Sequence, residues 1–101
     1  MSRIIYKYPI DTIDHLKTEL MLPVKKFEVG PKFLRVGLGV DDFPYVWVEH
    51  NSNETGECEM EKFVLHVIRT GDSFEPNNLT YLGSFVENPY YVWHIYIENK
   101  S

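Results

Sequence analysis

The side chains best suited to chemistry in this chain are one cysteine, four histidines and a scatter of acidic groups. Cys58 lies between Glu57 and Glu59, whose carboxylates oppose formation of the thiolate that a nucleophile needs. His50, Cys58 and His66 have the right atoms for zinc, but no CxxC, HxH or HExxH spacing places two ligands on one local element. We therefore expect neither a catalytic cysteine nor a metal site.

Serine and glycine motifs are equally uninformative. Neither Ser73 nor Ser84 lies in the GxSxG turn that holds the nucleophile of many hydrolases. Gly37 and Gly39 fall inside a predicted strand rather than before a helix, so they do not form a phosphate-binding loop. We expect no cofactor, and we favour a non-enzymatic role while leaving an enzymatic one open.

Aromatic residues supply the best candidate binding surface, because seven Tyr, six Phe and two Trp exceed what one small core readily encloses. A packed core with a contact between identical subunits is favoured over a ligand pocket. We expect Trp47 and Trp93 to be largely buried, and at least one Tyr among positions 90, 91 and 96 to lie at a subunit contact. The candidate binding residues are Trp47, Tyr90, Tyr91, Trp93, His94 and Tyr96.

Period-two alternation of apolar and polar residues predicts most of the secondary structure. Turn-forming residues separate the alternating segments at short intervals, and no strand-helix alternation is visible. The expected fold is mostly β, an antiparallel β-sandwich or barrel-like sheet of six to seven strands. The predicted strands span residues 3–8, 32–40, 45–50, 61–70, 79–87 and 90–97.

Two of these segments carry finer expectations. Residues 32–40 and 45–50 should form a hairpin, with Phe33 on the opposite face from Leu34 and Val36. In residues 61–70, apolar side chains on both faces indicate a central strand. The polar segment 51–59 is expected to be an exposed, mobile loop.

The segment from Asp11 to Leu22 fits two patterns. Ile13, Leu16 and Leu20 would share one face of a helix, so one short helix near residues 11–20 is one interpretation. Thr18, Leu20 and Leu22 would equally share one face of a strand. The two readings stay open.

Composition sets the remaining bounds. A chain of 101 residues predicts a single domain over 1–101, and a net charge of −5 disfavours binding to nucleic-acid phosphates. There is no run of about 20 apolar residues and no charged-then-apolar leader, so we expect no membrane segment and a cytoplasmic location. A lone cysteine fits a reducing compartment.

Several short motifs resemble, in their order along the chain, those of a known group. They are the segments Ile5–Pro9, Lys32–Val36, Thr70–Gly71, Tyr81–Phe85 and Val92–His94. In this order they resemble the small, uncharacterised β-rich proteins of tailed bacteriophages and prophages. The chain departs from that pattern by a longer segment at 11–30 and an acidic loop after His50. The resemblance implies a phage setting in the cytoplasm of an infected bacterium, and it supplies no catalytic residues.

Three functions are carried forward. The first is a non-enzymatic phage accessory protein that binds a host protein in host takeover or counter-defence, acts as a small homo-oligomer, and uses its aromatic surface and loop 51–59. The second is a small-molecule or nucleotide-binding protein whose aromatic pocket uses Trp47, Trp93 or His94. The third is a minor virion component.

Overall fold

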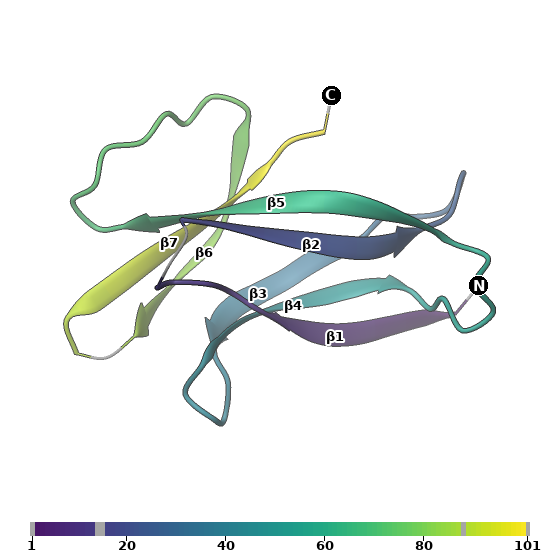
Figure 1. Cartoon of the computed structure of the whole chain (residues 1–101), viewed down its shortest axis with the longest axis horizontal. Coiled ribbons are helices and arrows are strands. Elements are labelled where there is room, and N and C mark those ends of the chain that lie inside the picture. Colours follow the sequence, from purple (N-terminus) through teal and green to yellow (C-terminus); the bar gives the residue numbers. More distant parts are fainter. Residues whose placement is uncertain (1, 14–15, 88, 101) are drawn as a thin grey trace.

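The computed structural model describes residues 2–13, 16–87 and 89–100, and within these ranges the fold is all β, with seven strands and no helix. The strands are β1 (Arg3–Pro9), β2 (Lys17–Val24), β3 (Lys32–Leu38), β4 (Pro44–Asn51), β5 (Glu59–Arg69), β6 (Leu79–Glu87) and β7 (Tyr91–Glu98). They form two antiparallel sheets, ordered β1-β4-β3 and β2-β5-β7-β6. Figure 1 shows the two layers as an open sandwich rather than a closed barrel.

The sandwich is held by alternate side chains that point between the sheets. The inner face of β5 presents Phe63, Leu65 and Val67, and β4 contributes Val46 and Val48 from the opposite sheet. Neighbouring residues point outward and are more exposed, as the pleat of a strand requires. The predicted central position of β5 is confirmed, because it lies between β2 and β7.

The segment around residues 11–20 is a connection followed by β2, so the helix interpretation is wrong where the structure describes this segment; residues 14 and 15 lie outside the described residues. The backbone N–H of Ile13 donates to the Asp11 carboxylate, which is a local turn rather than a helix start. The strand pattern prevails because Leu20 and Leu22 bury their side chains against β5 while Met21 stays exposed between them.

The predicted hairpin of β3 and β4 is confirmed, but the predicted alternation in β3 is wrong. A bulge at Leu34 shifts the register between Phe33 and Arg35. The extra residue lets Phe33 and Val36 both face the core and leaves Leu34 exposed. A second bulge lies in β6, between Tyr81 and Gly83.

The two flanks of the sandwich are closed differently. At one flank the bulged strands β3 and β6 approach so closely that a Cβ on Gly83 would lie 2.9 Å from Cγ2 of Val36. At the other flank the edges of β1 and β2 face each other without pairing. Glycine at position 83 is therefore a packing requirement of the closed flank.

Candidate functional site

The hairpin of β6 and β7 fixes Trp93 at one end of the sandwich. Its indole is 7% exposed, and Nε1 donates to Oε1 of Glu87 at 3.0 Å. The Thr12 hydroxyl donates to the same carboxylate oxygen at 2.9 Å, and the Tyr91 ring stacks on Trp93 with 6.1 Å between centroids. Glu87 thus ties the aromatic pair to the connection between β1 and β2.

A hollow of about 430 Å³ opens beside this pair. We call it the Trp93 hollow. Its apolar wall includes Ile13 and Leu16, which are 88% and 58% exposed, and its polar wall includes Arg69 and Asp72. Aromatic rings and arginines next to exposed aliphatic groups are typical of surfaces that bind other proteins.

The ion pair of Arg69 and Asp72, 3.2 Å between Nη2 and Oδ1, also borders a second hollow of about 260 Å³. We call this the His94 hollow. It lies on the outer face of the four-stranded sheet, where Phe74 packs on Tyr96 with 5.1 Å between ring centroids. The ion pair therefore lines both aromatic hollows.

A chain of hydroxyl groups surrounds the His94 ring. Nδ1 lies 2.7 Å from the Ser84 hydroxyl, and Nε2 lies 2.7 Å from the Thr70 hydroxyl. The Tyr81 hydroxyl is in turn 2.5 Å from Ser84. Both ring nitrogens thus bond hydroxyls, whereas a serine-hydrolase histidine is oriented by a carboxylate. The arrangement holds the ring in place but does not match a catalytic triad.

The six sequence-predicted residues are divided by the fold. Tyr91 and Trp93 line the Trp93 hollow, while His94 and Tyr96 line the His94 hollow. Tyr90 is 83% exposed in the turn before β7, next to Tyr91. The predicted burial is confirmed for Trp93.

Trp47 lies apart from the other five residues, on the outer face of the three-stranded sheet. It is only partly buried, because the Arg35 guanidinium covers its ring at 4.4 Å and Tyr45 packs on its edge. The predicted burial therefore holds only in part for Trp47. Its partners belong to β3 and β4, so it does not share a pocket with Trp93 or His94.

Sequence reasoning missed Arg69, Asp72 and Glu87. The sequence carried a weak signal for the first two, since an arginine at the end of a strand and an aspartate three residues later, after a glycine turn, are placed to pair. Glu87 gave no signal, because its role depends on the pairing of β6 with β7.

The connection between β4 and β5, residues 52–58, lies at the opposite end of the molecule from the start of β7 (Figure 1), where Tyr91 and Trp93 line the Trp93 hollow. The prediction of an exposed loop at 51–59 is wrong at two positions, because Asn51 and Cys58 are buried. The Cys58 N–H donates to the Asn53 side chain, and the Ser52 N–H donates to the Ser2 carbonyl. These bonds anchor both ends of the connection.

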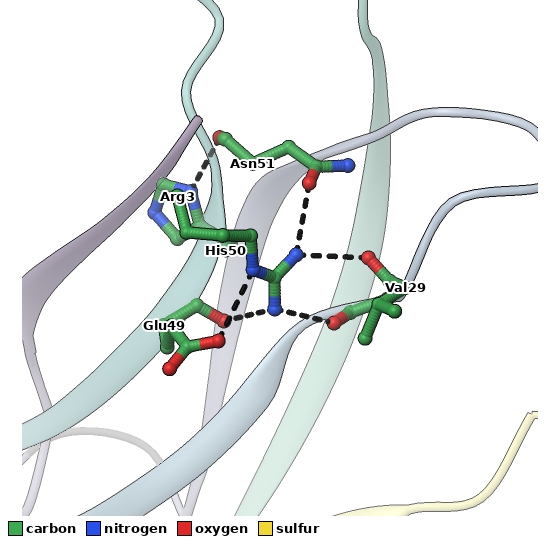
Figure 2. A network of polar contacts seen from close by, with 6 residues as sticks. Arg3, Val29, Glu49, His50 and Asn51 are labelled. Carbon is green, nitrogen blue, oxygen red and sulfur yellow. Dashed lines mark hydrogen bonds and ion pairs between the residues drawn. The ribbon is translucent and has the colours of Figure 1, made fainter. Parts of the chain in front are cut away.

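Arg3 joins three segments at this end, as Figure 2 shows. Its guanidinium donates to the carbonyls of Val29 and Gly30 at 2.8 and 2.9 Å, and to Oδ1 of Asn51 at 2.9 Å. Nε also pairs with the Glu49 carboxylate at 3.1 Å. One side chain therefore links β1 to β4 and to the segment that precedes β3.

An apolar groove of about 350 Å³ runs between the free edges of β1 and β2. Its walls include Ile4, Tyr6 and Tyr8 from β1 and Met21 from β2, with buried His50 at its base. Nδ1 of His50 is 2.9 Å from the carbonyl of the next residue, which can only accept, so this nitrogen carries the proton. Nε2 then accepts from the Tyr8 hydroxyl at 2.6 Å.

The pKa values of two side chains that hydrogen-bond to histidines, one in the groove and one on the other sheet, are shifted. Burial, and then the neighbouring Tyr6, raise the pKa of Tyr8 above its usual value. On the outer face of the other sheet, the hydrogen bond from His66, 2.6 Å from Nε2 to the carboxylate, lowers the pKa of Glu98. Both shifts favour the protonation states that these hydrogen bonds require at neutral pH.

Within residues 2–13, 16–87 and 89–100, no cluster of three or more His, Cys, Asp or Glu side chains is arranged to hold a metal ion. In the same ranges, no helix has the length and apolar character to cross a membrane.

Fold and site together define a small all-β sandwich domain with aromatic hollows at one end and an apolar groove along one flank. The chain belongs to the family described as domain of unknown function DUF7352, whose model matches residues 1–101. Comparison with curated proteins gave no match, and comparison with solved structures gave none either.

Proposed function

We propose that this domain is a non-enzymatic phage accessory protein that binds a host protein in the bacterial cytoplasm, acting as a small homo-oligomer. The observation that supports binding is the Trp93 hollow. There the exposed side chains of Tyr91, Ile13 and Leu16 lie around a half-exposed arginine, Arg69. Protein interfaces concentrate their binding energy in Tyr, Trp and Arg residues at such positions.

The hollow is also pre-organised, which lowers the entropic cost of binding. Trp93 is held by Glu87, and Glu87 is held by Thr12, so the ring stack has a fixed orientation before a partner arrives. Tyr90 and Ile13, at 83% and 88% exposure, extend the surface beyond the hollow. Apolar side chains this exposed become favourable to bury once a partner covers them.

Capture from bacterial lysate with surface variants tests this proposal. We expect the wild-type chain to retain a discrete host protein, and we expect Tyr91→Ala and Arg69→Ala to reduce its recovery at least about tenfold, the effect of 1.4 kcal/mol. The matched control is Phe27→Ala, since Phe27 is 96% exposed in the connection between β2 and β3. Recovery that is equal for all four chains would refute a partner site at the Trp93 hollow.

A small-molecule or nucleotide ligand is the second candidate, and the ring stack in a hollow of about 430 Å³ is the observation that favours it. Ligand pockets commonly span about 300–1,000 Å³. In a thermal-shift screen, a nucleotide at 100 times its dissociation constant should add about 2.7 kcal/mol of stability. A panel without any shift would exclude this candidate.

A further inference from the structure

The free edge of β1 is the least protected edge in the molecule. The edge strands β3 and β6 each carry a bulge, and β2 carries Pro23 within its length. Bulges and prolines at edges prevent a further strand from pairing. In contrast, β1 keeps an unbroken register of seven residues with β4, and its single proline, Pro9, is the last residue of the strand.

The hydrogen-bonding pattern shows which backbone groups of β1 point outward. Beyond the two ends of the strand, the Ser52 N–H donates to the Ser2 carbonyl and the Ile10 N–H donates to the Pro44 carbonyl. Because hydrogen-bonded pairs recur at every second residue of an antiparallel register, Ile4, Tyr6 and Tyr8 bond β4. The N–H and C=O groups of Arg3, Ile5 and Lys7 therefore face away from β4.

The side chains of β1 leave apolar surface on both faces of this edge. Tyr6, on the groove face, is 53% exposed, and Ile5, on the outer face, is 56% exposed. Charged side chains commonly protect an edge strand. Here the Lys7 ammonium lies over its own sheet, 4.4 Å from the centroid of the Tyr45 ring, and leaves the edge uncovered. An antiparallel strand added here would cover both apolar side chains.

We propose that the occupant of this edge is β1 of a second copy of the chain, paired antiparallel about a two-fold axis at Tyr6. This inference deepens the proposed function, from which it takes the homo-oligomer. The two three-stranded sheets would become one continuous six-stranded sheet. The Trp93 hollow lies outside the paired edge, so each copy keeps its own hollow.

Strand length and charge together select the register, since an axis at Ile4 or Tyr8 would pair only three of the seven residues of β1. In a two-fold dimer of this kind, side chains on the groove face of one β1 lie opposite side chains on the groove face of the other. The axis must therefore pass between the two copies of one residue, which then pairs with itself. An axis at Ile5 would oppose Arg3 to Lys7, and an axis at Lys7 would oppose that residue to itself; both place like charges directly opposite each other. An axis at Tyr6 opposes Ile5 to Lys7 and Ile4 to Tyr8, with no like charges.

The Tyr6 register also matches the outward backbone groups. Ile5 and Lys7 of opposite copies form hydrogen-bonded pairs, and the Arg3 N–H can donate to the Pro9 carbonyl. On the outer face, Lys7 of the second copy lies beside Ile5, whose other cross-strand neighbour is Glu49. A cation from one copy and a carboxylate from the other thus flank the same apolar side chain, which favours a second copy over an unrelated strand.

Sedimentation velocity over about 1 µM to 1 mM protein tests this interface. We expect a reversible shift from 11.9 kDa toward twice that mass. Ile5→Lys should weaken dimerisation at least about tenfold, because the introduced lysine opposes Lys7 at two symmetric places. Adding Lys7→Glu to that variant should restore the dimer, since residue 5 then meets an opposite charge only in the Tyr6 register.

A second measurement does not depend on the variants. In amide hydrogen exchange, protection of Ile5 and Lys7 should rise with protein concentration, while Tyr6, which bonds β4, should be protected throughout. A wild-type chain that stays monomeric at all concentrations, with Ile5 and Lys7 unprotected, would overturn the dimer. Capture by the Trp93 hollow could still succeed then, so the two proposals fail separately. A dimer that the double variant does not restore would overturn the Tyr6 register.

Discussion

The two flanks of this sandwich differ in how closely their edge strands approach each other. On the closed flank, the bulges at Leu34 and Leu82 and the missing side chain of Gly83 let β3 and β6 come together. On the open flank, β1 and β2 remain apart, and Tyr8, Tyr6 and two methionines line a groove between them. Local irregularity closes a flank, whereas a regular strand leaves one available for pairing.

The largest effect should come from adding volume to the closed flank. Gly83→Ala places a Cβ against buried Val36, and overpacking of this kind should cost about 2 to 3 kcal/mol of unfolding free energy. Gly30→Ala is the matched control, because nothing lies within 4 Å of its added Cβ. Urea denaturation measures both. Equal stability of the two variants would show that the closed flank accepts the added methyl group and that glycine is not required at position 83.

On the open flank, the contact to test is the hydrogen bond inside the groove. Tyr8→Phe leaves the buried Nε2 of His50 without its donor, and this should cost about 2 kcal/mol. Tyr6→Phe is the control, since the Tyr6 side chain is half exposed. A thermal melt in which the two variants lose the same stability would contradict the role given to this bond.

A third variant tests how Arg3 joins β1 to β4 and to the segment that precedes β3. Arg3→Lys keeps the charge but cannot reproduce the planar fork that reaches Val29, Gly30 and Asn51, and we expect a loss of about 1 kcal/mol. Proteolysis of the segment before β3 should accelerate in parallel. Lys7→Arg serves as the reciprocal control on the same strand, and it should change neither measurement.

The smallest effect should be a pH dependence on the outer face, away from both flanks. The hydrogen bond from His66 lowers the pKa of Glu98 below 4.5. The stability that the ionised Glu98 adds to the folded state is therefore present above that value and is lost as the pH falls through the folded-state pKa. Glu98→Gln should lower stability slightly at neutral pH and make the loss of stability shallower as the pH falls below 4.5. Glu75→Gln, an exposed control, should leave the decline unchanged.

Strand positions could be predicted because alternation is local. Phe63, Leu65 and Val67 lie every second residue in the sequence and all point into the core. The bulge at Leu34 was missed because an inserted residue resets the alternation without changing the composition of the strand. The ambiguity before Pro23 was resolved only by packing, since Leu20 fits the helical and the strand period equally well until β5 lies beside it.

The site was harder to predict because it depends on strand order. Tyr91, Trp93, His94 and Tyr96 are close in sequence, yet the pleat sends the first two to one hollow and the last two to another. Trp47 resembles Trp93 in its neighbours but belongs to the other sheet. No local pattern shows that Glu87 would hold an indole or that Arg69 would border two hollows.

Cys58 offers an experimental consequence of its burial. It is the only thiol in the chain and lies where the backbone passes from one sheet to the other. A thiol reagent must therefore wait until this crossing opens, so the rate of modification reports how often the two layers separate there, with no mutation needed.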